Sequence, residues 1–177
     1  WINKPAIVFG SYQNPYREIN FPFAWEKDIP IIRRITGGGT VYHDFGNINY
    51  SIIKKENPEK MDYVRVMAPI IRALNELGYP VDHRNSCDIY LGDKKISGNA
   101  QKMSKGRLLH HGTLLFDADL TELKQSTSKK QDQIQSKGIA SRPAHVGNLK
   151  DYRQGPYGTT RDFMEALAMV WIPQQAE

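Results

Sequence analysis

Residues 33–44 read RRITGGGTVYHD, with three consecutive glycines between an apolar run and a strand-like run. Three glycines in a row destabilise helices and strands alike, and they suit a place where the backbone must approach a ligand closely. Backbone amides left free in such a loop can bind an anion, and the preceding pair of arginines can bind phosphate or carboxylate. The loop has neither GxxxxGK nor GxGxxG spacing, which excludes a Walker loop and a dinucleotide-binding fingerprint. A hairpin tip with flanking surface charge is the alternative interpretation.

On both sides of this loop, short apolar runs alternate with turn residues and with only a few helical patterns. Strands are predicted at residues 6–10, 31–35, 41–44, 48–53, 89–91, 95–101 and 108–116. Strands that alternate with few helices favour a mixed sheet with helices packed on it over a strict βαβ winding. The sequence therefore predicts an α/β fold of the α+β, mixed-sheet kind.

Apolar residues repeat at helical spacing in residues 61–77 and 160–171. The predicted buried face of the first helix consists of Val64, Ala68, Ile71 and Leu74. In the second helix Thr160 is the predicted N-cap, and the shared face consists of Phe163, Leu167, Val170 and Trp171. Residues 121–137 are polar and carry four lysines, so we expect a solvated loop, a frayed helix or a functional loop there.

The composition is that of a globular chain. Of its 177 residues 40% are hydrophobic and 24% charged, which excludes a disordered or fibrous protein. Lys and Arg number 24 against 19 Asp and Glu, which gives a net charge of +5. This excess suits phosphate-bearing ligands or an acidic protein partner, and it is too small to indicate nucleic acid by itself.

Apolar runs and cysteine content indicate the cellular compartment of a protein. No apolar run approaches the roughly 18 residues that span a bilayer, and a single cysteine, Cys87, excludes an internal disulfide and a multi-cysteine metal site. We therefore expect a cytoplasmic protein. The chain opens on Trp1, one short step before a predicted core strand, so we also expect a fragment that is trimmed at both ends.

A second feature is the stretch GDKKISGNAQ at residues 92–101. Strand alternation predicts one polar face, made of Lys95, Ser97, Asn99 and Gln101. Lys95 would then enter a ligand cleft beside Ser97, where its amine can hold a carboxylate or acyl-phosphate oxygen and stabilise charge during acyl transfer. The alternative is an exposed edge-strand lysine, and the neighbouring Lys94 fits that interpretation.

The histidines and the cysteine carry weaker signals. Adjacent residues of a strand point to opposite faces, so His43 and Asp44 do not predict a catalytic triad, and His43 is expected to be structural or to contact a ligand. The side chains of His110 and His111 diverge in the same way, and no Cys or Glu nearby completes a zinc site. Cys87 is expected to be a small buried hydrophobe rather than a nucleophile.

Taken together, these segments resemble the lipoate–protein ligases in order and spacing. The resemblance rests on residues 33–44 with Gly46-Asn47, on KISG at residues 95–98 with Ala100, and on HHGTLL at residues 110–115. Further agreement comes from Gln13-Asn14, Glu18, Lys137-Gly138-Ile139, Ser141, Val146, Asn148 and Leu149. The resemblance covers nearly the whole chain.

The resemblance implies a biotin/lipoate ligase-like catalytic domain, related to the cores of class II tRNA synthetases. It implies one domain over residues 1–177 that is truncated at its N-terminus and lacks a C-terminal accessory domain. It further implies that lipoate and ATP, with Mg²⁺, form lipoyl-adenylate. The lipoyl group then passes to a lysine of a lipoyl carrier domain of an oxoacid dehydrogenase complex, or of the glycine cleavage H protein. The expected state is a monomer.

The resemblance also implies site residues. Lys95 is the expected catalytic residue. The residues expected to bind ATP and the adenylate are Arg34, Gly39, Thr40, Val41, Tyr42, Lys95 and Lys137. Those expected to bind lipoate are Gly37, Gly38, His43, Lys95 and Ser97. No metal ligand is assigned.

The sequence departs from the family pattern at two places. The family has Arg-Asn-Asp before the lysine strand, where this chain has Ser86-Cys87-Asp88, and it has Ser-Val-Arg-Ser-Arg-Val where residues 141–146 read SRPAHV. Two alternative functions stay open. One is an octanoyl- or lipoyl-transferase that works through a cysteine thioester without ATP; such proteins have Gly-Gly-Arg at the position of Gly37-Gly38-Gly39. The other is a remnant that binds lipoate or the carrier without turnover.

Overall fold

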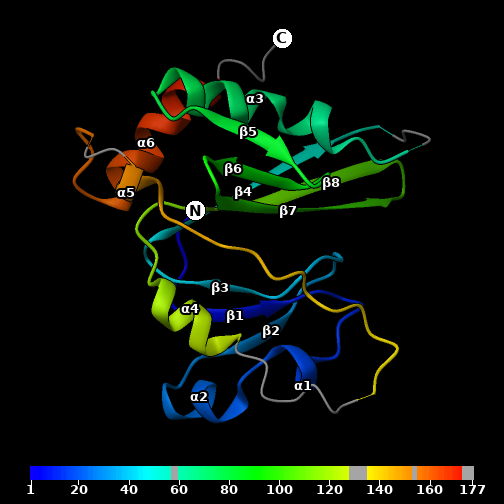
Figure 1. Ribbon diagram of the computed structural model, residues 1–177. Coiled ribbons are helices and arrows are strands. Elements are labelled where there is room, and N and C mark those ends of the chain that lie inside the picture. The colour runs from blue at the N-terminus through cyan, green and yellow to red at the C-terminus, as the bar shows by residue number, and fades with distance from the viewer. Residues whose placement is uncertain (57–59, 128–134, 153–154, 173–177) are drawn as a thin grey trace.

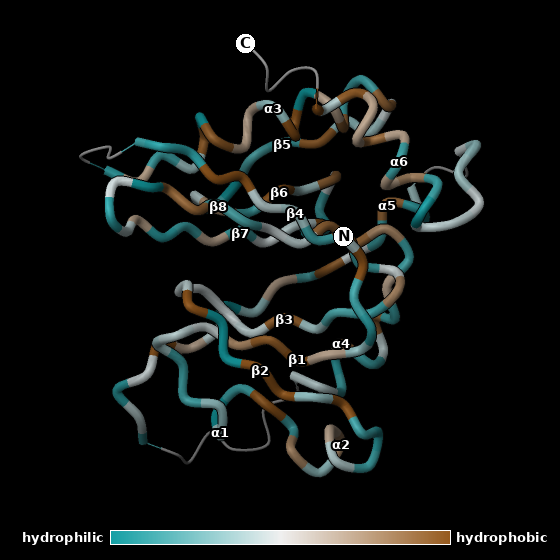
Figure 2. Tube along the Cα trace, turned by 180° about the vertical axis from the view of Figure 1, so that it is seen from behind, coloured by the Kyte–Doolittle hydropathy of each residue, from teal (hydrophilic) through white to brown (hydrophobic). Residues whose placement is uncertain are grey.

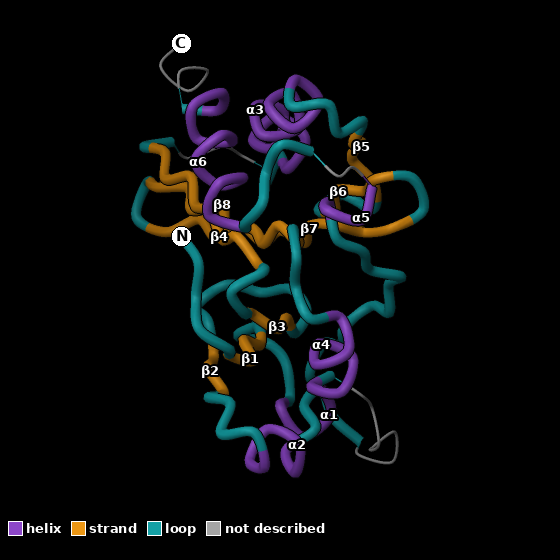
Figure 3. Tube along the Cα trace, turned by 90° about the vertical axis from the view of Figure 1, so that its left-hand side faces the viewer, coloured by secondary structure: helices purple, strands orange, loops and turns teal. Residues whose placement is uncertain are grey.

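The computed structural model describes residues 1–56, 60–127, 135–152 and 155–172. Two β-sheets lie one above the other, and helices cover the outer face of each (Figure 1). The view along the sheets in Figure 3 shows the same succession of helix, sheet, sheet and helix. The mixed α/β architecture predicted from the sequence is confirmed, with two sheets in place of one.

The larger sheet has the strand order β4-β8-β7-β6-β5, with every neighbouring pair antiparallel. Its strands are β4 (Asn47–Lys54), β5 (Val81–Arg84), β6 (Asp88–Leu91), β7 (Lys94–Ser104) and β8 (Arg107–Leu115). The smaller sheet has the order β2-β1-β3, with β1 parallel to β2 and antiparallel to β3. Its strands are β1 (Ala6–Phe9), β2 (Ile31–Arg33) and β3 (Val41–His43).

The helices divide between the two outer faces. The helices next to the five-stranded sheet are α3 (Tyr63–Glu76), α5 (Leu149–Tyr152) and α6 (Thr160–Trp171). The helices next to the three-stranded sheet are α1 (Pro15–Glu18), α2 (Phe21–Glu26) and α4 (Leu120–Ser126). Figure 2 shows apolar stretches of chain in these layers, with polar stretches at the loops. Among the described residues, no helix is long and apolar enough to cross a membrane.

Helix α3 forms where it is predicted, but its buried face differs from the prediction. Asp62 caps the helix by accepting a hydrogen bond from the amide of Arg65 at 3.0 Å. The buried residues are Val66, Met67, Ile70, Ala73 and Leu74. Val64 was expected in that face and is 57% exposed. Several stripes of this helix carry apolar residues, and packing against the sheet selects among them.

Helix α6 shows a one-residue correction at its start. Thr159, not Thr160, is the N-cap: its hydroxyl accepts from the amide of Asp162 at 3.2 Å. The Asp162 carboxylate in turn accepts from the Thr159 amide at 2.9 Å, which completes a reciprocal capping box. The predicted inward face is confirmed, because Phe163 and Leu167 are buried and Val170 and Trp171 pack against the same core.

Several elements were absent from the sequence prediction. These are the short helices α1, α2 and α5 and the edge strand β5. Part of the polar stretch 121–137 belongs to α4, which is a regular helix, and residues 128–134 lie outside the described residues. Elements of four to six residues are hard to predict from periodicity because they hold too few repeats of a helical or strand pattern.

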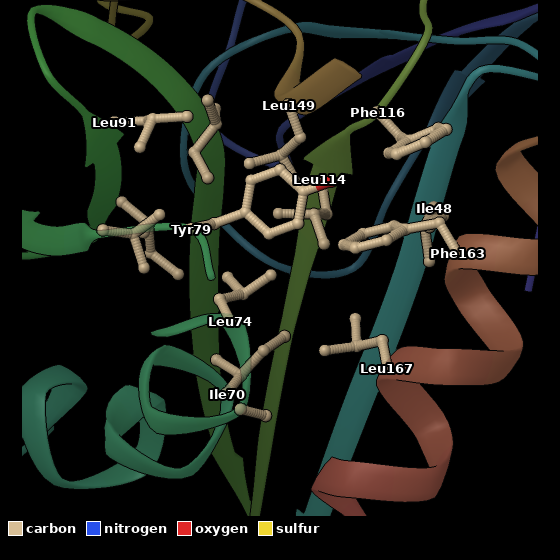
Figure 4. Packing of buried hydrophobic residues seen from close by; sticks show 14 of the residues in the cluster. Ile48, Ile70, Leu74, Tyr79, Leu91, Leu114, Phe116, Leu149, Phe163 and Leu167 are labelled. Atoms are coloured by element: carbon tan, nitrogen blue, oxygen red, sulfur yellow. The ribbon is translucent and has the colours of Figure 1, made fainter. Parts of the chain in front are cut away.

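Aromatic stacking forms the centre of the main core, between the five-stranded sheet and helices α3 and α6 (Figure 4). Phe163 of α6 stacks on Phe116 with ring centroids 4.5 Å apart and planes 10° from parallel. Tyr79 meets the same ring edge-on at 5.4 Å. Phe163 is completely buried, so it anchors α6 to the sheet.

The chain passes between the two sheets at a corner made of Asp44 and Gly46. The Asp44 carboxylate accepts from the amide of Gly46 at 2.8 Å and from the amide of Asp119 at 2.7 Å. The Gly46 carbonyl accepts from the amides of Phe116 and Asp117, each at 3.0 Å. A Cβ at Gly46 would overlap the Asp117 carbonyl, so only glycine fits. The corner thereby ties the β3–β4 crossing to the end of β8.

Replacing Phe163 tests the anchoring role of the aromatic stack. Phe163→Ala removes a fully buried ring, so we expect the free energy of unfolding to fall by about 3–5 kcal/mol. Met169→Ala on the same helix is the control, because Met169 is 77% exposed and its loss should change the free energy by no more than about 0.5 kcal/mol. Urea denaturation measures both, and equal effects would contradict the proposed anchor.

Candidate active site

A cavity of about 640 Å³ lies between the two sheets. It is bordered by the end of the glycine loop and β3, by β7 and β8, by helix α4, and by residues 141–146, which we call the strap. The apolar lining residues include Val41, Leu115, Leu120, Leu123 and Val146. A cavity of this size and lining can enclose an elongated apolar ligand with a polar end.

Lys95 lies at this cavity as part of an ion pair. Its Nζ is 2.7 Å from Oδ1 of Asp88, and the two side chains are 23% and 12% exposed. Gly98 leaves room for the amine, since a Cβ there would lie 3.3 Å from Cε and Nζ of Lys95. A largely enclosed ammonium beside one carboxylate is suited to hold an anionic ligand group.

The predicted alternation along the lysine strand is wrong at Lys95. Ser97 borders the cavity, but it pairs with buried Ile89, which puts its side chain on the helix-facing side of the sheet, whereas Asp88 pairs with Gly98 on the cavity side. The register between β6 and β7 shifts by one residue opposite Ile96, which places Lys95 on the face of Gly98 and not of Ser97. Such a β-bulge changes the facing of every residue on one side of it.

Arg34 holds the glycine loop in shape. Its guanidinium donates to the carbonyls of Gly37 (2.7 and 3.1 Å), Gly39 (2.6 Å) and Val8 (3.1 Å). Burial lowers the pKa of Arg34 to about 10, which leaves it charged at neutral pH. Gly38 has a φ of +88°, and a Cβ there would meet the guanidinium at 2.9 Å. The arginine therefore binds loop carbonyls and orders the loop.

The strap is bonded to the glycine loop through Ser141. Its hydroxyl accepts from the backbone amide of Thr40 at 2.9 Å and from the side-chain amide of Gln13 at 2.9 Å. The amide of Ser141 donates to both carboxylate oxygens of Glu18 at 3.2 Å. Glu18 is only 3% exposed, and it borders the cavity. This contact covers one side of the cavity with the strap.

The other end of the strap pairs with the lysine strand. The Lys95 amide donates to the carbonyl of His145 at 2.8 Å, and the Gly147 amide donates to the carbonyl of Lys95 at 3.1 Å. A parallel bridge joins Lys95 to Val146. The strap thus connects the glycine loop to the backbone of Lys95 across the cavity.

Helix α4 is a wall of the site that the sequence prediction missed. Asp119 caps it by accepting from the amides of Thr121 and Glu122, each at 2.9 Å. Glu122 in turn accepts from the Tyr42 hydroxyl at 2.5 Å. The Tyr42 ring thus packs toward α4, within the hydrophobic cluster of the three-stranded sheet. An Asp followed three residues later by Glu is a helix-start pattern, and this signal could have located α4.

Three histidines lie in or near the buried layers. Burial, together with the nearby Arg34 and His111, lowers the pKa of His43 to about 4. Burial also lowers the pKa of His110 to about 4. Nδ1 of His43 lies 3.0 Å from the side-chain nitrogen Nδ2 of Asn3, and Nε2 of His111 lies 2.6 Å from the Thr36 hydroxyl. These histidines are therefore neutral at pH 7.

The described residues contain no group of three or more His, Cys, Asp or Glu side chains that could hold a metal ion. Two carboxylates lie near the cavity. Asp88 is paired with the ammonium of Lys95, and Glu18 accepts from the backbone amide of Ser141. Mg²⁺ commonly binds through substrate phosphates and one or two carboxylates. The residues present therefore fit a magnesium ion carried in by a nucleotide better than one caged by protein.

The structure brings together part of the predicted site. The predicted residues that border the cavity are Thr40, Val41, Tyr42, Lys95 and Ser97. The predicted residues of the glycine loop and β3 that do not border it are Arg34, Gly37, Gly38, Gly39 and His43. Lys137 is exposed and borders a separate shallow hollow with Tyr12 and Asn14. Contact of any of these residues with a ligand stays a prediction.

Solved structures share this arrangement of sheets. The crystal structure of P. falciparum LipL1 in complex with lipoate matches with a TM-score of 0.81 and 27% sequence identity, over 100% of this chain and 49% of that one. The fold is therefore that of a lipoate ligase catalytic domain, as the motif resemblance implied.

Sequence comparison agrees with the structural match. Lipoate-protein ligase LplJ of Bacillus subtilis is 38% identical over 168 residues, which are 94% of this chain and 50% of that protein. Lipoate–protein ligase 1 of Staphylococcus aureus is 37% identical over 157 residues, or 88% of this chain and 48% of that protein. The lipoyl protein ligase A/B catalytic domain matches residues 1–171, and the chain belongs to that family. It spans about half the length of these relatives.

The buried histidines predict how stability depends on pH. In the unfolded chain the pKa of each is near 6.5, against about 4 in the folded protein for His43 and His110. Between these values the unfolded chain binds more protons, so stability is complete above about pH 6.5 and falls as the pH falls toward 4. The slope should reach about 1.4 kcal/mol per pH unit for each histidine.

Urea unfolding at pH 7.5, 6.0 and 5.0 measures this slope. His110→Gln should make it shallower, whereas His145→Gln, at a side chain that is 69% exposed, should leave it as in the parent protein. An identical slope in the parent and in His110→Gln would contradict the assignment.

Proposed function

We propose that this protein activates lipoate with ATP and transfers the lipoyl group to a lysine of a lipoyl carrier domain. The observation that carries the proposal is the Lys95 amine, 2.7 Å from Asp88, at a cavity whose opposite wall ends in the glycine loop. The names of the relatives and the lipoate bound to P. falciparum LipL1 support lipoate as the substrate. This chain spans about half the length of these relatives. That it carries out the activity for which the full-length relatives are named is therefore part of the proposal.

The cavity suits the two ends of lipoate. Apolar side chains such as Leu115, Leu120 and Leu123 offer a surface for the aliphatic tail and the dithiolane ring. Lys95 supplies a cation for the carboxylate. We propose that lipoate contacts Gly37, Gly38, His43, Lys95 and Ser97.

In the proposed first step, a carboxylate oxygen of lipoate attacks the α-phosphorus of MgATP, and pyrophosphate leaves. Negative charge develops on the α-phosphate oxygens, where Lys95 and the loop amides can stabilise it. Thr40 borders the cavity, and its backbone amide donates to Oγ of Ser141 in the structure. We propose that the nucleotide and the adenylate contact Arg34, Gly39, Thr40, Val41, Tyr42, Lys95 and Lys137. In this proposal Arg34 acts mainly by ordering the loop, because its donors already bind carbonyls.

In the second step, the amine of the acceptor lysine attacks the acyl carbon of lipoyl-adenylate. An amide bond forms, the acyl–phosphate bond breaks, and AMP leaves. Positioning of the acceptor supplies much of the acceleration in such a step. The proposed carriers are lipoyl domains of oxoacid dehydrogenase complexes and the glycine cleavage H protein. A cytoplasmic, monomeric catalytic domain over residues 1–177 is part of the same proposal.

The described structure favours the ligase over a cysteine-dependent transferase. Cys87 is half-buried, and burial together with the nearby Asp88 raises the pKa of its thiol. A nucleophilic cysteine needs the opposite shift, toward thiolate at neutral pH. Cys87 also does not border the cavity. Pyrophosphate release would separate the ligase from a non-catalytic remnant.

The first test is a mass-shift assay on a lipoyl carrier domain. With lipoate, ATP and Mg²⁺ the carrier should gain one lipoyl group, and Lys95→Ala should lower the rate by at least about 100-fold, because the cation that faces the developing charge is gone. Lys94→Ala, at the adjacent residue, is the matched control and should retain most activity. Circular dichroism checks that both variants fold.

The outcomes of this assay separate the functions. A gain only from an octanoyl-loaded acyl carrier protein, without ATP, would establish a transferase. Lipoate binding without pyrophosphate release would indicate a binding remnant. Normal turnover by Lys95→Ala would overturn the site assignment.

Cys87→Ser tests the thioester alternative directly. We expect the variant to keep at least about half of the ATP-dependent rate, because the thiol plays no part in the proposed chemistry. Initial rates of pyrophosphate release measure this, and complete loss of activity with an intact fold would revive the cysteine mechanism.

A further inference from the structure

A buried chain of hydrogen bonds crosses the five-stranded sheet on its helix-facing side. The hydroxyl of Tyr50 on β4 donates to Oδ1 of Asn99 on β7. Nδ2 of Asn99 donates to the carbonyl of Cys87 at 2.9 Å and to Oγ of Ser97 at 3.2 Å. Tyr50 and Asn99 are 5% and 7% exposed, so these bonds are shielded from water.

A glycine in the sheet leaves the space that the hydrogen bond between Tyr50 and Asn99 needs. Strand β8 lies between β4 and β7, and its Gly112 pairs with Tyr50 on one side and with Asn99 on the other. A Cβ at Gly112 would overlap Oδ1 of Asn99 and would lie 2.7 Å from the Tyr50 hydroxyl. Any other residue at this position would block the contact between Tyr50 and Asn99.

The Cys87 carbonyl ends a turn that is unfavourable by itself. The residues before it, Asn85 and Ser86, have φ values of +52° and +67°, in the left-handed region that residues with a Cβ seldom adopt. The backbone amide of Asn99 also donates to this carbonyl, at 2.9 Å. Asn99 thus donates two hydrogen bonds to the end of the turn. These bonds stabilise the left-handed backbone of Asn85 and Ser86, which is unfavourable by itself.

The residue after this carbonyl is Asp88, the partner of Lys95. Asp88 pairs with Gly98 in the sheet, and its carboxylate holds Nζ of Lys95 at 2.7 Å. A shift of the Cys87 carbonyl moves the backbone of Asp88, and so moves the carboxylate that orients the amine. The contacts from Tyr50 to Lys95 are therefore continuous across three strands.

We propose that Asn99 is a positioning residue for Lys95, which it orients through the Cys87 carbonyl and Asp88. The proposal rests on the proposed function of Lys95 in adenylate formation. Asn99 touches neither the cavity nor a substrate, since it faces the helices on the other side of the sheet. Asn99 contributes to the orientation of the Lys95 amine during the reaction. Its loss should therefore lower kcat rather than weaken substrate binding.

Asn99→Ala tests this with pyrophosphate release in the presence of lipoate and MgATP. We expect kcat to fall about tenfold while KM for lipoate stays within about twofold. In an Asp88→Asn background the same substitution should lower kcat by less than about twofold, because the route to Lys95 is already broken. Tyr50→Phe, which removes a single hydroxyl and keeps the ring, should lower kcat about threefold.

Leu108→Ala is the matched control, because Leu108 is buried on the same sheet without contact to this chain of bonds. It should lower the unfolding midpoint and leave kcat unchanged. If Asn99→Ala does not fold, Tyr50→Phe carries the test. A folded Asn99→Ala or Tyr50→Phe with the parent kcat would overturn the proposal, as would a tenfold loss that persists in the Asp88→Asn background.

A second readout does not depend on activity. In lysine-labelled protein, the NMR signal of the Lys95 side chain should lose its distinct position in Asn99→Ala and keep it in Leu108→Ala. If the parent protein releases no pyrophosphate, the proposed function fails, and this signal still tests the positioning. An unmoved Lys95 signal in Asn99→Ala would overturn the positioning role whatever the activity.

Discussion

The corner at Asp44 and Gly46 is the constraint on which the rest of the molecule depends. Its hydrogen bonds of 2.7–3.0 Å tie the strand crossing between the sheets to the start of α4. This junction sets how the two sheets face each other, and the cavity lies between them. A buried carboxylate bonded to two amides, beside a glycine that no Cβ can replace, gives a corner with a single geometry.

Around the cavity, charged and polar side chains are used to shape the backbone. Arg34 binds carbonyls of the glycine loop, and Glu18 binds the amide of Ser141 in the strap. These two side chains therefore order the backbone that surrounds the cavity. Lys95 is the exception, because its amine is held at the cavity by a single carboxylate. An ordered loop and one positioned cation are what an adenylate-forming site needs before the substrate arrives.

The sequence predicted a set of site residues and misjudged parts of the geometry around them. The glycine loop and Lys95 stand out by composition, so both could be predicted. The side of the sheet on which the Lys95 side chain lies could not be predicted, because the bulge at Ile96 depends on the pairing of β6 with β7. The wall formed by α4 was missed because it lies in a polar, lysine-rich stretch. Asp88 was noted only as part of the Ser86-Cys87-Asp88 stretch and was given no role, although it is the partner of the amine.

The sequence by itself determined most of the strands, the long helices, the glycine loop and the family, and it predicted Lys95 as a site residue, because periodicity and motif spacing are local properties. The tertiary structure decided the division into two sheets, the buried face of α3 and the side of the sheet on which Lys95 lies. It also decided that Tyr50, Gly112 and Asn99 meet across three strands. Residues 49 positions apart come into contact only when strand order and register are set, and no local pattern encodes them.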